Sequence, residues 1–406
     1  MLSTRGEGYA KAGLADGYLG PPKTVFDKDT KQGIVSFSNA ENVSSSLDRT
    51  TLTYHEGPFG SSRLRTAMTN LITSYFHPAT PISPNNIVFS NGVTSLNAIC
   101  ALSLTNAGDG ILLGQPIYGS FTGDLHVPSN CQLIYTPFHG DDPFSPDAVA
   151  RYEETFLKAR DEAGVTIRAL LICNPHNPLG QCYSRETLEA LLLFCQKYQI
   201  HLISDEVYAL SVYGNDDSVG FVSVLSIDPV PLEVDPALIH VIGITARMLD
   251  QSESEAFLQA ALSMSRFHWP SNISCSVATA VLEDRDFVKT FLQKSRGLLR
   301  SHRDLAVQAL EEAGIPFVQG SIAGFFLWID LSMCLDNTIV GSQGEWAAEL
   351  DLSRRLQQIG VVMSSGHAYH NEVAGWFRVI FSVEMESFKV ELSRIIEFYH
   401  SSGGSG

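Results

Sequence analysis

Short apolar runs alternate with helical segments through the first two thirds of the chain. Apolar residues follow helical spacing over 63–76, and we also predict helices over 94–108, which stops at Gly108, and over 184–200. The strand-like runs lie at 85–92, 109–116, 167–178, 201–208 and 237–244. Because these runs are almost entirely apolar, they are typical of a parallel sheet that helices cover on both faces. The pattern therefore predicts a large, doubly wound α/β domain with a mostly parallel sheet.

The final third of the chain has a different pattern. A long helix, two strands and two further helices are predicted there, at 295–315, 324–331, 345–360, 375–383 and 387–399. This mixed order predicts a second, smaller α+β domain. We assign 51–285 to the large domain and 286–400 to the small one, and we expect the irregular residues 1–50 to pack with the small domain. The Gly/Ser tail at 401–406 is expected to be flexible.

Size and charge narrow the classes of protein and partner. A chain of 406 residues is too long for one ordinary core, and its 44% hydrophobic and 17% charged residues are typical of a globular protein. The net charge of −17 repels nucleic acid and anionic membranes, so we expect neither as a partner. An anionic ligand would need a local positive pocket that opposes this field.

Seven cysteines, an odd number without a CxxC pair, favour reduced and buried thiols in an intracellular protein. The first residues contain no apolar run typical of a signal peptide, and no stretch reaches the length of a membrane span. We therefore expect a cytoplasmic location. No metal site is predicted.

The candidate ligand-binding residues lie where the predicted strands end, which is where doubly wound sheets bind ligands. NGVTS at 91–95 joins a strand to a helix through glycine, so free backbone N–H groups and the hydroxyls of Thr94 and Ser95 could cradle an anion. Tyr118 in QPIYGSF could stack on a flat ring. Each motif alone is more typical of an ordinary turn or a half-buried tyrosine. NPHNPLG at 174–180 is more specific, because two Asn-Pro pairs and a glycine hold the amide of Asn177 in a rigid loop.

Two further motifs carry charge. SDEVY at 204–208 ends an apolar strand with carboxylates, and Asp205 is the candidate to pair with a protonated pyridine nitrogen, with Tyr208 near the phenolic oxygen of the ring. We interpret Glu206 as a helix-start or surface contact. Arg378 lies in the aromatic strand GWFRVIFS, where its fork suits a substrate carboxylate, although a structural salt bridge is the better interpretation of that residue alone.

Taken together, these motifs resemble the pyridoxal-phosphate (PLP) enzymes of fold type I in aminotransferase class I/II. SNAENVSSSLD at 38–48, LTYHEGPFGSSRLRTAM at 52–68 and AGFFLWIDL at 323–331 are similar to the branch that contains 1-aminocyclopropane-1-carboxylate (ACC) synthases and their fungal relatives. The resemblance extends from about residue 34 to residue 398. It implies PLP as cofactor, an α-amino acid as substrate, transamination or elimination as reaction, and a role in amino acid metabolism.

The resemblance also implies roles for individual residues. Val93 and Thr94 match the cradle of the cofactor phosphate, and Tyr118 matches the aromatic that stacks on the ring. Asn177 and Tyr208 match the partners of the ring 3-oxygen, and Asp205 matches the partner of the ring nitrogen, which makes the ring an electron sink.

Two more matches concern the substrate and the partner subunit. Arg378 matches the clamp on the substrate α-carboxylate. Tyr54 resembles the tyrosine that reaches the phosphate of the neighbouring subunit's cofactor. This last match implies a homodimer with shared active sites.

The chain departs from the family where the Schiff-base lysine should follow the strand at 237–244. The family has a Ser/Thr-Lys pair and then Arg-x-Gly, whereas here Thr245 is followed by Ala246 and Arg247, without a glycine two positions after the arginine. No lysine occurs between Lys197 and Lys289. Thr245 and Arg247 remain candidate cofactor contacts, but the residue that forms the aldimine and moves the Cα proton is missing.

Several explanations of this gap stay open. Our preferred hypothesis is a gene-model or splicing loss of a short block, because every other motif survives. A Lys→Ala change at 246 would not explain the lost Arg-x-Gly spacing. A true pseudoenzyme that binds PLP without turnover is the main alternative, and substitution by Lys289 or Lys294 is a weaker one. A nucleotide-binding α/β enzyme is disfavoured, because no GxGxxG or Walker pattern follows an early strand.

Overall fold

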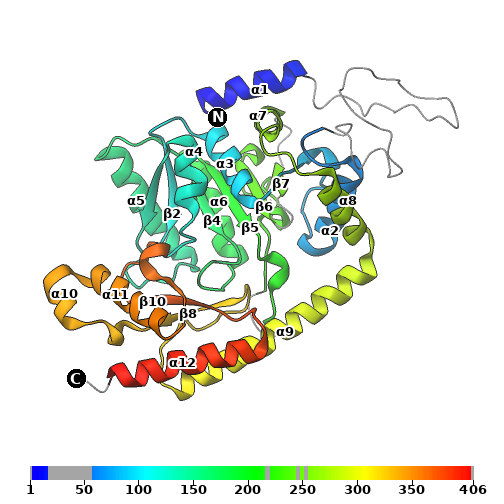
Figure 1. The fold of residues 1–406 in the computed structure, drawn as a ribbon. Coiled ribbons are helices and arrows are strands. Elements are labelled where there is room, and N and C mark those ends of the chain that lie inside the picture. The colour runs from blue at the N-terminus through cyan, green and yellow to red at the C-terminus, as the bar shows by residue number, and fades with distance from the viewer. Residues whose placement is uncertain (1, 17–56, 215–219, 244–246, 251–254, 404–406) are drawn as a thin grey trace.

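The computed structural model describes residues 2–16, 57–214, 220–243, 247–250 and 255–403, and it has the α/β fold expected, with one large and one smaller sheet (Figure 1). The large domain is built on a seven-stranded sheet in the order β1-β7-β6-β5-β4-β2-β3. These strands are β1 (Ile87–Phe89), β2 (Gly110–Gly114), β3 (Gln132–Thr136), β4 (Ile167–Cys173), β5 (His201–Glu206), β6 (Ile239–Gly243) and β7 (Arg247–Asp250).

Parallel pairing runs through most of this sheet, as predicted. β3, β2, β4, β5 and β6 pair parallel to one another, whereas β7 pairs antiparallel with both β6 and β1. Helices cover both faces: α2 (Ser62–Phe76), α3 (Val93–Leu104), α5 (Val149–Asp161), α6 (Arg185–Tyr198), α7 (Glu255–Ser265) and α8 (Asn272–Glu283). The fold class predicted from the apolar runs is therefore confirmed.

Burial on both faces explains why these strands contain few polar residues. Along β4, Leu170 and Ile172 enter the core on one face of the sheet, and Ala169 and Leu171 enter the core on the other. All four side chains are almost completely buried. Each apolar strand therefore contributes to two cores, at roughly 25 cal/mol per Å² of apolar surface removed from water.

The smaller domain is a three-stranded antiparallel sheet, β8-β10-β9, packed on long helices. Its elements are α9 (Arg285–Glu312), β8 (Phe326–Asp330), α10 (Asn337–Gln343), α11 (Glu345–Gln358), β9 (Ser364–Ser365), β10 (Trp376–Ile380) and α12 (Met385–Gly403). Helix α9 begins ten residues before the predicted start at 295, because the side chain of Asp284 accepts a hydrogen bond from the N–H of Phe287 and caps it.

The N-terminal helix differs from expectation. Helix α1 (Thr4–Asp16) packs against α3 and α7 of the large domain, on the side of the molecule away from the small domain (Figure 1). The N–H of Ser3 donates to the Ser103 carbonyl at 3.1 Å, and the Arg5 guanidinium donates to the Thr105 carbonyl at 3.1 Å. The helix therefore satisfies carbonyls at the end of α3 in the large domain. Residues 17–50 lie outside the described residues, so the packing of that part on the small domain stays a prediction.

The cysteines behave as the sequence predicts. All seven are free and buried. Among the helices that the structure describes, none is long and apolar enough to cross a membrane.

Candidate active site

Six of the residues singled out by sequence line one cavity of about 150 Å³ at the carboxyl ends of the parallel strands. We call it the strand-end cavity. Its walls are Val93, Thr94, Asn97, Tyr118, Asp124, Cys173, Asn177, Asp205, Val207 and Tyr208. Sequence reasoning missed Asn97, Asp124 and Cys173, which belong to no motif, and Val207, which lies within SDEVY but was given no role.

Helix α3 points its N-terminus at the cavity. Gly92 is its N-cap, with φ 144°, a conformation that side chains rarely adopt, and no side chain caps the helix. The first turn, at Val93 and Thr94, therefore presents backbone donors and the positive end of the helix dipole. This arrangement suits a phosphate.

Asp205 carries the carboxylate at the end of β5. Only 5% of its surface is exposed, and its Oδ1 accepts a hydrogen bond from the N–H of Val207 at 3.1 Å. Burial raises the pKa of Asp205 from 3.8 to about 7, against the lowering effect of the Val207 N–H. A cationic N–H donor in the cavity would stabilise the charged carboxylate, which is what a protonated pyridine offers.

Arg378 on β10 reaches the same region from the small domain. Its Nη1 donates to Oδ1 of Asn177 at 2.9 Å, and its guanidinium lies 5.2 Å from the ring of Phe326 and 5.0 Å from that of Tyr369. The Nε atom is buried without a partner in the described part of the chain. No described carboxylate forms an ion pair with this arginine, and its side chain does not belong to the lining of the strand-end cavity.

Two tyrosines complete the walls. The ring of Tyr118 meets Phe121 edge to face at 5.3 Å. Tyr208 packs edge to face on Phe325 and Phe326, and burial raises the pKa of its hydroxyl. Tyr208 therefore stays protonated and acts as a hydrogen-bond donor.

Glu206, beside Asp205, has a structural place. It is fully buried and accepts hydrogen bonds from the hydroxyl of Ser223 at 2.6 Å and the N–H of Val224 at 2.9 Å. Val224 begins a short 3₁₀ helix, Val224–Ser226. The predicted helix-start contact is therefore confirmed, and the surface location offered beside it is wrong.

The position where the family resemblance expects the Schiff-base lysine lies in the short connection between β6 and β7. Gly243, the last residue of β6, pairs antiparallel with Arg247, the first residue of β7, so only three residues join the strands. Thr245 and Ala246 lie outside the described residues, as do Tyr54 and the side chain of Arg247. None of the described lysines lines the strand-end cavity.

The two lysines proposed as replacements can be placed, because both lie among the described residues. Lys289 and Lys294 are both exposed on α9. The hypothesis that one of them substitutes for the missing lysine therefore gains no support from their placement.

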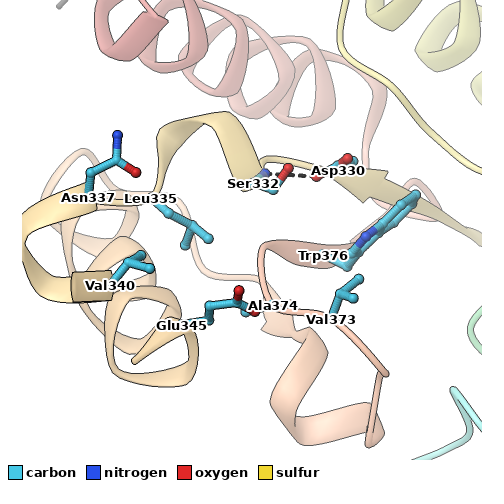
Figure 2. Close-up of a pocket in the computed structure, with 9 residues that line it drawn as sticks. All are labelled: Asp330, Ser332, Leu335, Asn337, Val340, Glu345, Val373, Ala374 and Trp376. Carbon is cyan, nitrogen blue, oxygen red and sulfur yellow. Dashed lines mark hydrogen bonds between the residues drawn. The ribbon is translucent and has the colours of Figure 1, made fainter. Parts of the chain in front are cut away.

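A second cavity, of about 350 Å³, lies within the small domain (Figure 2). Trp376 forms one side, and Asp330 accepts a hydrogen bond from the N–H of Ser332 at 2.8 Å at its rim. It shares no residue with the strand-end cavity, and no sequence motif predicted it. The larger cavity therefore lies apart from the residues that carry candidate chemistry.

Comparison with known proteins agrees with this geometry. The family described as Aminotransferase class I and II matches residues 55–395. "1-aminocyclopropane-1-carboxylate synthase-like protein 1" of Mus musculus is 30% identical over 348 residues, 82% of this chain and 66% of that protein. "Probable aminotransferase tcpI" of Claviceps purpurea is 31% identical over 362 residues, 85% of this chain and 80% of that protein. This chain thus spans slightly less than two thirds of the mouse relative.

Solved structures share the fold at low identity. Aspartate aminotransferase from Thermus thermophilus with maleate superposes with a TM-score of 0.67 and 17% identity, over 98% of this chain and 88% of that one. Aromatic aminotransferase from Pyrococcus horikoshii superposes with a TM-score of 0.68 and 18% identity, over 99% of this chain and 92% of that one.

One further sequence relative has a name that bears on activity. It is "Probable inactive 1-aminocyclopropane-1-carboxylate synthase-like protein 2" from Mus musculus, which is 29% identical over 86% of this chain and 60% of its own length.

Proposed function

Because the chain belongs to the aminotransferase class I and II family, whose enzymes depend on PLP, we propose that the strand-end cavity holds PLP and an α-amino acid without covalent attachment and without turnover. The observation that carries this proposal is the combination of a formed cavity with a three-residue connection at the lysine position. The ligand-binding residues are kept, while the residue that would perform the proton transfer is absent.

The described residues would suit three polar groups of the cofactor, namely its ring nitrogen, its 3-oxygen and its phosphate. Asp205 would accept the ring N–H, and the Tyr208 hydroxyl would donate to the 3-oxygen. Asn177 offers its Nδ2 to the same oxygen, because its Oδ1 already accepts from Arg378. The N-terminus of α3 at Val93 and Thr94 would hold the phosphate.

The substrate side of the cavity is equally suited to an amino acid. Arg378, which is hydrogen-bonded to Asn177 beside the cavity and does not belong to its lining, would bind the α-carboxylate, and Tyr118 would support one face of the ring. When bound, PLP supplies an electron sink for the Cα bonds of an amino acid. No described lysine lines the cavity, so this chain would bind and orient the ligand without moving the Cα proton.

The simplest test is a titration of the purified protein with PLP. We expect a saturable absorbance change that dialysis reverses, and a much weaker change for Asp205→Asn. Asp141→Asn is a matched control, because it removes one exposed carboxylate that does not line the cavity. Absence of saturable binding to the wild type would overturn the proposal.

A catalytic form of the protein is the second candidate. It is favoured by the survival of the ring-binding residues in one cavity and of Arg378, the candidate carboxylate-binding residue, hydrogen-bonded to Asn177 beside it. If the genomic sequence around codon 246 encodes an in-frame segment with lysine, the longer chain would be a transaminase or an ACC synthase-like lyase. A 2-oxo acid product would identify the transaminase, and ammonia with an eliminated group would identify the lyase.

We also propose a homodimer in the cytoplasm. The dimer rests on the match of Tyr54 to a residue that crosses between subunits, and the location rests on reduced, buried cysteines. Sedimentation of the purified protein at twice the mass of one chain would support the dimer, and sedimentation as a monomer would refute it.

A further inference from the structure

Among the cavity residues that have no place in the proposed binding scheme, two are joined by a hydrogen bond. Asn97 lies on α3, and Asp124 lies in a π-helical turn, Thr122–His126. The Nδ2 of Asn97 donates to Oδ2 of Asp124 at 3.1 Å, and their exposed fractions are 1% and 6%. π-Helical turns are rare and are frequent at functional sites.

Burial of this carboxylate is costly unless a positive group compensates it. The amide of Asn97 supplies one neutral hydrogen bond, and no described Lys, Arg or His forms an ion pair with Asp124. The Oδ1 of Asn97 itself has no partner among the described groups. The pair therefore lacks, within the described residues, the cation that would normally accompany a buried carboxylate.

The charges around Asp124 point to a cationic ligand. Asp205 faces the same cavity from β5, Cys173 from the end of β4, and Tyr118 and Tyr208 from the loops after β2 and β5. Arg378, the nearby cation of β10, is turned to Asn177 and does not line the cavity. Two carboxylates thus share one small, largely buried space, and the negative charge of Asp124 adds to burial in raising the pKa of Asp205.

We propose that Asn97 and Asp124 form a positioning pair that keeps the ring nitrogen of the bound cofactor protonated. This inference rests on the proposed function. Asn97 holds Asp124 in place, and the negative charge of Asp124 strengthens the hold of Asp205 and the pyridine on their shared proton. The ring should therefore remain a pyridinium at higher pH than Asp205 alone would allow.

The test uses pyridoxamine 5′-phosphate labelled with ¹⁵N in the ring, a probe that has no aldehyde and forms no imine. The ¹⁵N chemical shift of the bound probe is followed through the alkaline range in wild type, Asp124→Asn, Asp124→Glu and the surface control Asp141→Asn. We expect Asp124→Asn to lose the ring proton roughly one pH unit lower than wild type. Asp124→Glu, which keeps the charge, should lie closer to wild type than Asp124→Asn, and Asp141→Asn should match wild type.

The outcomes separate this inference from the function on which it rests. If the wild type does not bind the probe, the proposed function fails. If the wild type binds and Asp124→Asn titrates at the same pH, the inference fails while the function stands. If Asp124→Asn and Asp124→Glu lower the pH of ring deprotonation equally, the inference also fails, because packing rather than charge would then be responsible. Should Asp124→Asn not fold, Asp124→Ser replaces it as the neutral variant, with the same two outcomes.

Discussion

His176 should make the protein sensitive to mild acid. Its ring is 3% exposed within the 174–180 loop, meets Phe144 edge to face at 5.4 Å, and has an Nδ1 without a described partner. Burial lowers the pKa of His176 from 6.5 to about 3. The unfolded chain therefore takes up a proton as pH falls through 6.5, while the folded chain stays neutral until about pH 3. Stability present above pH 6.5 is lost through this window, and at about pH 5 the loss is about 2 kcal/mol.

A comparison of two proteins at two pH values isolates this effect. Urea unfolding of wild type and His176→Gln would be measured at neutral pH and at about pH 5. The variant starts less stable because its packing changes, but its further loss on acidification should be smaller than that of wild type by about 2 kcal/mol. His240 also has a pKa lowered by burial and titrates in both proteins, so it cancels. Equal losses in the two proteins would refute the reasoning.

Three further predictions follow from the site. Asp205→Asn should weaken PLP binding roughly ten- to a hundredfold, because a charge-assisted hydrogen bond is lost, as isothermal titration can check; unchanged affinity would contradict its assignment. Arg378→Lys should weaken binding of an N-phosphopyridoxyl amino acid by about tenfold while leaving PLP alone unaffected, and equal effects on both ligands would refute a role for the clamp. Glu206→Gln should lower the free energy of unfolding by roughly 1–3 kcal/mol, because it weakens the buried hydrogen bonds from Ser223 and Val224. It should have little effect on PLP affinity. Thermal unfolding would measure the change, and an unchanged melting temperature would argue against it.

Much of the fold could be predicted because the central strands are apolar on both faces. The runs around Leu170 and Ile242 read as buried strands without any knowledge of their neighbours. Strand β7 could not be recognised in this way, since Arg247–Asp250 has four residues and becomes a strand only through pairing with β1 and β6. Such elements depend on tertiary contacts that no local pattern encodes.

The candidate site likewise contains residues that the sequence could predict and residues that only the fold reveals. Asp205 and Asn177 stand out because polar residues that end apolar strands are conspicuous in a sequence. Asn97 and Asp124 are separated by 27 positions and lie inside or beside apolar helical stretches, where each looks like an isolated polar residue. A lone Asn within the apolar helix SLNAICALSL was the available signal, and only the fold reveals its partner.

The position expected for the Schiff-base lysine can be described from both the sequence and the strand pairing. The sequence predicted a gap next to Ala246, and the structure pairs Gly243 with Arg247 across it. Only residues 244–246 lie between these two strands, and none of them is a lysine.

Borohydride reduction of the protein mixed with PLP, followed by mass spectrometry of its peptides, tests the central claim most directly. Borohydride converts any imine between PLP and a lysine into a stable bond. We predict that PLP binds saturably in the titration, yet that no peptide gains the mass of a phosphopyridoxyl group at a stoichiometry matching the bound cofactor. Stoichiometric labelling of a single lysine would contradict this account, because another lysine would then reach the cavity and catalysis by this chain would be chemically possible.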